Sequence, residues 1–257
     1  MNYGIIKLSV VPLRAEPAHR SEQISQLLFG ESYEVMQEQH GWLLIKCLYD
    51  DYQGWINAAQ HVGLAEKDFM LLGDTVKAVA LETACTASSS ESSLALLAGS
   101  TLPSFDGLNF KIGREKFVYN GQAIIPDGAR NPVLLEKVAM RYLNAPYLWG
   151  GRSPFGIDCS GFTQVVFKFL NIALKRDAYQ QAEEGVALNF LEESTVGDLA
   201  FFANEEGKIT HTGILLKDNR IIHASGKVRI DKIDHFGIFQ TETKKYSHQL
   251  KIIRRVL

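Results

Sequence analysis

Cys159 and His211 are the residues whose types and settings best suit nucleophilic chemistry. A thiol becomes reactive when its pKa is lowered, and both a helix N-terminus and a nearby imidazole have that effect. Cys159 follows a segment rich in Gly and Pro, and apolar residues at helical spacing come after it, so we predict that it opens a helix. We therefore expect a thiolate at Cys159 near neutral pH. Cys47 and Cys85 lack these features and are predicted to be structural.

A second histidine, His223, stands close to His211 in the chain. His211 comes at the start of a predicted strand over 212–216, and His223 near the end of the next one, over 220–224. In a catalytic triad one group takes the proton of the nucleophile and another orients that base, which predicts His211 as the base and His223 as the orienting residue. A loop of odd length with a bulge places both rings on one face of the hairpin, so we predict a positive φ at Asn219.

The composition indicates a globular protein without a strong long-range electrostatic field. Hydrophobic residues make up 46% and charged residues 22%, and the formal net charge is -2, which disfavours nucleic acid and anionic membranes as partners. No run approaches the roughly 18 apolar residues of a membrane helix, and residues 1–16 lack the pattern of a signal peptide, which favours a cytoplasmic location. Three cysteines without a close pair argue against a disulfide framework and a zinc site, and no cofactor or metal is expected.

The first half of the chain has the rhythm of small β-barrels. Short β-prone runs separated by turn residues predict one barrel over residues 1–62, with strands at 5–11, 33–37, 42–48 and 54–56. A second β-rich stretch from about Asp68 to Ile125, with turns at 73–74, 106–107 and 120–121, predicts another barrel over residues 63–127.

The sequence pattern changes after Asp127 from short β-prone runs to helical spacing. Asn131 can cap a helix running to about Leu143, and Pro132 fits its first turn. One face of this helix is predicted to be buried, and so is a stripe on the helix that Cys159 opens: Leu135, Val138, Ala139 and Tyr142 on the first, and Phe162, Val165, Val166 and Phe169 on the second. Strands follow at 199–202, 212–216, 220–224 and 249–254. Residues 128–257 are therefore predicted to form an α+β domain.

Five short motifs in this domain resemble those of the NlpC-type peptidases, which have a papain-like core: 146–151 (PYLWGG), 158–162 (DCSGF), 197–199 (GDL), 211–214 (HTGI) and 223–225 (HAS). The resemblance implies hydrolysis of the γ-D-glutamyl to diamino acid bond in murein peptides. It implies that Cys159 is the nucleophile, His211 the base, His223 the orienting residue and Tyr147 a helper near the oxyanion.

The same resemblance implies which residues contact the substrate. Asp158 and Ser160 flank the nucleophile, where members of the family contact the amino end of the substrate. In the segment 176–181, Ala178 replaces a serine that some members use for such a contact.

The N-terminal part resembles the bacterial SH3-like domains attached to such peptidases, in segments 13–17, 26–31 and 52–56. In related multi-domain enzymes a barrel closes the end of the groove, which implies a substrate with a free N-terminal L-Ala and a role in cell-wall peptide recycling. We expect the Tyr52 hydroxyl to reach the substrate amine, with Glu22 or Glu16 offering a carboxylate.

Two other functions fit the same sequence. The barrels could make the chain a murein-binding protein whose papain-like domain is secondary. Papain-like domains also serve amidases and acyltransferases, because a fold alone does not determine the reaction.

Overall fold

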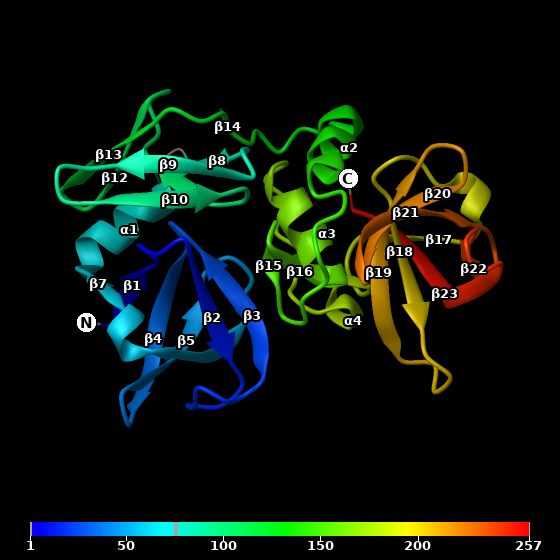
Figure 1. The fold of residues 1–257 in the computed structure, drawn as a ribbon, viewed down its shortest axis with the longest axis horizontal. Helices are drawn as coiled ribbons and strands as arrows, with labels where there is room; N and C mark the ends of the chain where they lie inside the picture. Colours follow the sequence, from blue (N-terminus) through cyan, green and yellow to red (C-terminus); the bar gives the residue numbers. More distant parts are fainter. Residues whose placement is uncertain (1, 75–76, 257) are drawn as a thin grey trace. The chain divides into compact units, whose positions relative to one another are not determined.

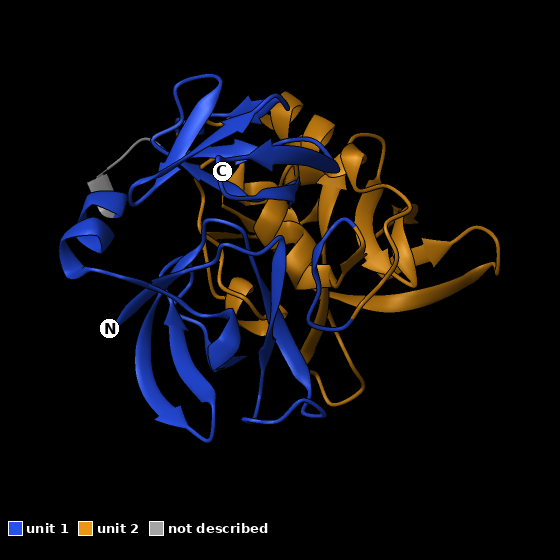
Figure 2. Cartoon of the chain, turned by 60° about the vertical axis from the view of Figure 1, so that its left-hand side comes forward, with its two compact units in different colours: residues 1–127, 149–154 blue, residues 128–148, 155–257 orange. Residues whose placement is uncertain are grey.

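The computed structural model describes residues 2–74 and 77–256. The described residues form two compact units, one of residues up to Asp127 together with 149–154, and one of 128–148 together with 155 onwards (Figure 2). The predicted separation of 1–62 from 63–127 is a finer division, and it stays a prediction.

The first unit begins with an SH3-like antiparallel sheet in the order β3-β2-β6-β5-β4-β1-β7. Its core includes Leu13, Leu27, Tyr33 and Ile45, all at most 1% exposed. The predicted continuous strand over 5–11 is wrong, because Ile5 and Ile6 are both buried and Ile6 bonds to the backbone of Gly30 and Glu31 instead of continuing β1. The elements are β1 (Tyr3–Ile5), β2 (Val10–Arg14), β3 (Gln23–Leu28), β4 (Ser32–Gln39), β5 (Trp42–Cys47), β6 (Gln53–Asn57), the 3-10 helix η1 (Ala58–Gln60) and β7 (Val62–Leu64).

The rest of this unit contains a helix that the sequence analysis missed. Helix α1 (Glu66–Asp74) covers the start of the predicted second β-rich stretch, and the turn predicted at 73–74 is the end of this helix. Phe69 anchors it by stacking on Tyr3, with ring centroids 4.0 Å apart. Acidic residues in its first turn, Glu66 and Asp68, suit the helix dipole.

Two further sheets follow α1, in the orders β10-β9-β13-β12 and β11-β8-β14. The turns predicted at 106–107 and 120–121 are confirmed, since both lie between strands. Phe29 packs in one buried cluster with Phe110 and Phe117, so residues from both halves of the unit share a core. The strands are β8 (Lys77–Ala80), β9 (Ala84–Ser88), β10 (Ser93–Leu97), β11 (Thr101–Pro103), β12 (Asn109–Ile112), β13 (Glu115–Tyr119) and β14 (Ala123–Ile124).

The second unit has the predicted α+β order, with helices first and an antiparallel sheet after them (Figure 1). Helix α2 (Pro132–Arg141) is capped by Asn131, whose side chain accepts from the Leu134 N–H, and the four residues predicted for its inner face are buried. Helix α3 (Cys159–Lys168) is buried along its whole length, including its predicted stripe. Short elements complete this part: β16 (Gly156–Ile157), α4 (Ala178–Gln181) and η2 (Leu191–Glu193). Strand β15 (Arg152–Ser153) lies in the segment 149–154, which belongs to the first unit.

The sheet of this unit runs in the order β17-β23-β18-β19-β20-β21-β22, with β22 also pairing with β23. The predicted strands are present, and each is longer than predicted, while β17, β21 and β22 were not predicted. The strands are β17 (Val186–Leu188), β18 (Leu199–Ala203), β19 (Ile209–Leu216), β20 (Arg220–Ser225), β21 (Lys227–Ile233), β22 (Gly237–Gln240) and β23 (Lys245–Arg255). Across the described residues, the helices are too short or too polar to cross a membrane.

Candidate active site

Cys159 is the first residue of α3, and its side chain is 7% exposed. The Asp158 carboxylate caps the helix by accepting from the Gly161 N–H at 2.7 Å. Burial and the charge of Asp158 raise the pKa of the Cys159 thiol to about 12, although the backbone amides of Thr212 and Ser160 favour the thiolate. The predicted thiolate near neutral pH is therefore wrong for the resting structure, because loss of hydration outweighs the field of the helix.

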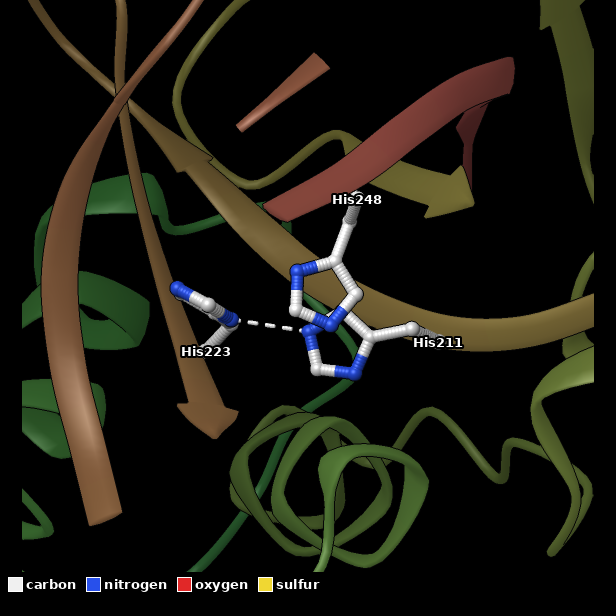
Figure 3. A group of neighbouring side chains, drawn as sticks. All are labelled: His211, His223 and His248. Carbon is white, nitrogen blue, oxygen red and sulfur yellow. Dashed lines mark hydrogen bonds between the residues drawn. The ribbon is translucent and has the colours of Figure 1, made fainter. Parts of the chain in front are cut away.

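His211 and His223 form the hydrogen-bonded pair that the hairpin predicts. Nε2 of His211 lies 2.8 Å from Nδ1 of His223, as Figure 3 shows, and Nε2 of His223 lies 2.9 Å from a carboxylate oxygen of Asp231. Arg229 donates to both oxygens of that carboxylate, at 2.7 and 2.8 Å. A chain of hydrogen bonds thus runs from Arg229 through Asp231 and His223 to His211.

The carboxylate decides which ring nitrogen carries each proton. Burial alone raises the pKa of Asp231, but hydrogen bonds from His223 and Arg229 bring it below its usual value, so Asp231 is an acceptor at neutral pH. His223 then carries its proton on Nε2, and its Nδ1 accepts from Nε2–H of His211. Nδ1 of His211 keeps a lone pair for a proton from a thiol. Burial and the other imidazoles hold the pKa of His211 well below its usual value, so the resting ring is neutral.

The register of the hairpin brings the two rings together. Leu216 pairs with Arg220, so the loop holds the three residues 217–219, and Gly213 lies opposite His223. His211 and His223 therefore share a face. The predicted positive φ at Asn219 is confirmed at 49°, and Asp218 is also left-handed at 61°. Gly213 is required here because a Cβ at this position would come within 2.7 Å of Cβ of His223.

A third histidine, His248 on β23, lies against this pair. Its ring stacks on that of His211 with centroids 4.0 Å apart and an interplanar angle of 22°. Burial and His223 lower the pKa of His248 to about 4, so this ring is also neutral near pH 7.

The residues predicted around the nucleophile have well-defined partners. Tyr147 is half-buried, and burial together with Cys159 raises its pKa to about 12, so its phenol keeps its proton. Asp158 and Ser160 are buried and both bind Arg176, which donates to Asp158 at 2.6 and 3.1 Å and to the Ser160 hydroxyl at 2.9 Å. Ala178 is the first residue of α4.

The three residues predicted from the barrel belong to the first unit. Tyr52 is partly buried against the core of the SH3-like sheet. Glu22 is exposed and accepts from the indole Nε1–H of Trp149 at 2.6 Å. Glu16 is exposed, and its backbone N–H donates to the Ser21 hydroxyl. Their predicted contact with substrate stays a prediction.

Sequence reasoning missed Arg229, Asp231 and His248. The alternation of Arg229 and Asp231 in one strand was the available signal, because residues two apart in a strand share a face and the chain turns back just before them. No short-range pattern marks His248, which is 25 residues beyond His223.

Comparisons with known proteins agree with the architecture of both units. Residues 144–247 match the NlpC/P60 family and residues 13–60 match the bacterial dipeptidyl-peptidase SH3 domain. The chain thus contains an NlpC/P60 domain, of a family of cysteine peptidases, preceded by a bacterial SH3 domain.

Two relatives and one solved structure illustrate the similarity. A γ-D-glutamyl-L-lysine dipeptidyl-peptidase of Bacillus cereus is 37% identical over 41% of this chain, a match that covers 32% of the relative's length. Dipeptidyl-peptidase 6 of Lysinibacillus sphaericus is 25% identical over 90% of this chain and 92% of its own length. The crystal structure of an NlpC/P60 family protein from Bacillus cereus covers 99% of both chains with a TM-score of 0.83 at 21% identity, which shows the same fold.

Proposed function

We propose that the protein is a cysteine endopeptidase that hydrolyses the γ-D-glutamyl to diamino acid bond of murein peptides with a free N-terminal L-Ala. The observation that carries this proposal is the chain of hydrogen bonds from Asp231 through His223 to His211, which leaves one lone pair on His211. Strand β19, which carries His211, packs against the helix that Cys159 opens, and the backbone amide of Thr212 interacts with the Cys159 thiol. The names of the relatives, among them a γ-D-glutamyl-L-lysine dipeptidyl-peptidase, support the substrate class. A role in cell-wall peptide recycling follows from the proposed substrate.

The reaction starts from a neutral thiol and a neutral imidazole. The sulfur of Cys159 attacks the γ-carbonyl carbon of D-glutamate while its proton moves to Nδ1 of His211. The resulting imidazolium is stabilised through His223 by Asp231. The C–N bond then breaks, and the amine of the diamino acid leaves with the proton from His211. A thioester remains on Cys159.

Water completes the cycle. His211 takes a proton from water as the hydroxyl oxygen attacks the thioester carbon, the C–S bond breaks, and the thiol recovers its proton. The phenol of Tyr147 keeps its proton at neutral pH, so it can donate to the oxyanion that forms in both steps.

The central experiment incubates L-Ala-γ-D-Glu-L-Lys with wild type and with Cys159→Ala, and identifies the products by mass spectrometry. We expect L-Ala-D-Glu and lysine from the wild type and none from the variant. Intact peptide after incubation with a folded wild type would contradict the proposal.

Variants of the histidine chain test the roles of its members. His211→Ala should abolish turnover, while His223→Ala should leave more residual activity because it is one step from bond making. Asp231→Asn, a positioning change, should lower kcat by about 100-fold with little effect on KM. An unchanged kcat for Asp231→Asn would show that the carboxylate serves stability alone.

The substrate's amino end is tested separately. N-acetylation of L-Ala should lower kcat/KM by orders of magnitude, because it removes the ammonium charge and leaves the carboxylates proposed to bind it without a partner. Tyr52→Phe should reduce the difference in kcat/KM between the peptide with a free L-Ala and the N-acetylated peptide. Equal cleavage of both peptides by the wild type would refute the requirement for a free amine.

The alternatives make different predictions in simple assays. A murein-binding protein would sediment with insoluble murein and leave the peptide intact. An amidase would release the peptide from muramic acid, and an acyltransferase would give a transfer product, and both products differ in mass from those of an endopeptidase.

A further inference from the structure

Three imidazoles that are far apart in the sequence meet at one point of the second unit. One ring nitrogen from each of His211, His223 and His248 can be chosen so that all three lie within 4.8 Å of one another. They come from β19, β20 and β23, three strands of one sheet. Figure 3 shows one nitrogen of His248 directed toward the hydrogen bond between His211 and His223 and the other directed away.

The surroundings of His223 and His248 already suit metal binding. In metal sites a ligating histidine donates its other N–H to a carboxylate, which orients the ring and raises its basicity. His223 makes this contact with Asp231 at 2.9 Å, so its Nδ1 offers a lone pair. Nδ1 of His248 lies 2.9 Å from the Ser247 hydroxyl, which can accept from Nδ1–H and leave the Nε2 lone pair for a cation.

The spacing is near that of a tetrahedral ion. Zn²⁺ binds imidazole nitrogens at about 2.1 Å, which places two such nitrogens about 3.4 Å apart. Nitrogens at the limit of 4.8 Å must come closer by about 1.4 Å, whereas Nε2 of His211 and Nδ1 of His223, which are 2.8 Å apart, must separate by about 0.6 Å. The rings of His211 and His248 are stacked, so they must also tilt for both lone pairs to reach one ion, and His248 is the half-buried ring at the edge of the group. Three neutral imidazoles are typical ligands for Zn²⁺, Cu²⁺ and Ni²⁺.

We propose that His211, His223 and His248 form an inhibitory site for a divalent transition-metal ion such as Zn²⁺, with water as a further ligand. For the ion to bind, His211 must present the lone pair of Nε2, so its proton moves from Nε2 to Nδ1. The hydrogen bond to Nδ1 of His223 is replaced by two bonds to the ion. The two states of His211 exclude each other, because the ligand tautomer carries a proton on the nitrogen that takes the thiol proton in the proposed mechanism. The ion therefore removes the general base without touching the carbonyl of the substrate.

Binding is measured first, because it does not depend on the proposed reaction. Tag-free Cys159→Ala protein is titrated with Zn²⁺ by calorimetry and with Co²⁺ by visible absorption, which reports tetrahedral coordination. We expect one ion per chain. In the same background, His248→Gln and His248→Phe should weaken Zn²⁺ binding by about 10- to 100-fold, and the Phe variant keeps an aromatic ring stacked on His211. His235→Gln, an exposed histidine of the same unit outside the group, is the matched control and should bind as before.

Two binding results would overturn the proposal. One is an unchanged affinity in both His248 variants. The other is the absence of binding in Cys159→Ala when the wild type binds, which would assign the ion to the thiolate instead of the three imidazoles.

Inhibition is the second measurement, and it rests on the proposed peptidase function. Zn²⁺ should inhibit cleavage of L-Ala-γ-D-Glu-L-Lys by the wild type, and EDTA should restore it. His248→Gln should retain cleavage without metal and need at least about tenfold more Zn²⁺ for the same inhibition. Binding that depends on His248 in a protein that cleaves no murein peptide would support the site while contradicting the peptidase. Equal inhibition of wild type and His248→Gln would overturn the inhibitory role.

Discussion

Two buried arginine–carboxylate pairs, one in each unit, use the same chemistry for different ends. Arg152 binds both oxygens of Glu31, at 2.8 and 3.0 Å, within the first unit. Arg176 binds both oxygens of Asp158, at 2.6 and 3.1 Å, within the second. All four side chains are at most 8% exposed. Such bidentate pairs fix geometry as well as charge.

The first pair holds a loop to the SH3-like sheet. Arg152 also donates to the carbonyl of Gln26 at 2.7 Å, and Glu31 accepts from the Leu28 N–H. Gly150 in the same loop has φ 73°, and a Cβ there would lie 2.3 Å from the carbonyl oxygen of Gln23, so the loop lies directly on β3. This pair therefore holds the loop that contains Arg152 against the SH3-like sheet.

The second pair holds the end of a helix. Asp158 caps α3 at the residue before Cys159, and Arg176 keeps its carboxylate in place while also binding the Ser160 hydroxyl. This pair therefore sets the position of the nucleophile. Loss of either pair should therefore lower the free energy of unfolding, but only loss of the second pair should directly lower kcat.

Arg176→Met is expected to have the largest effect. It leaves the Asp158 carboxylate buried without its arginine, which costs about 3–5 kcal/mol of unfolding free energy. It should also lower kcat more than 100-fold, because a displacement of about 1 Å in the nucleophile has effects of this size. Urea unfolding and peptide cleavage measure both. Arg220→Met removes an exposed arginine from the same unit and should change neither.

Arg152→Met should match that loss of stability but not the loss of turnover. The uncompensated Glu31 again costs about 3–5 kcal/mol, now in the first unit. At a temperature where the variant is folded, kcat should fall less than in Arg176→Met. A kcat loss equal to that of Arg176→Met would show that the two pairs do not differ in function.

Glu31→Gln in the Arg152→Met background should restore about 1–2 kcal/mol relative to the single variant. The neutral amide of glutamine replaces the buried Glu31 carboxylate that has lost its arginine, and its oxygen can still accept from the Leu28 N–H. Within the described residues Nε of Arg152 has no hydrogen-bond partner, so the original pair also carries an unmet donor. A double variant less stable than Arg152→Met would contradict this account of the pair.

Trp149→Phe is expected to have the smallest effect. It removes the hydrogen bond from Nε1 to Glu22 in the same loop, but the indole is 61% exposed, so the loss should stay below about 1 kcal/mol. Thermal unfolding compared with the wild type measures it. A loss of stability as large as that of Arg152→Met would show that the indole, and not the buried pair, holds the loop in place.

Local signals in the sequence determined the parts of the fold that depend on neighbouring residues. Asn131 before Pro132 predicted the start of α2, and the apolar spacing after Cys159 predicted α3, because caps and helical periodicity act within a few residues. The hairpin with Asn219 predicted that His211 and His223 share a face, since register follows from loop length. Helix α1 was missed because Phe69 packs on Tyr3, which lies 66 residues earlier in the chain.

Tertiary structure alone decided what surrounds the reactive groups. Burial of Cys159 beside Asp158 raises the thiol pKa, although the helix N-terminus by itself predicts the opposite. His248 reaches His211 through the pairing of β18 with both β19 and β23. Arg152 meets Glu31 across 121 residues of chain. Spacing along a chain sets which groups share a helix or a hairpin, but hydration and long-range neighbours depend on how distant segments pack, and these set the charge state and the partners of each group.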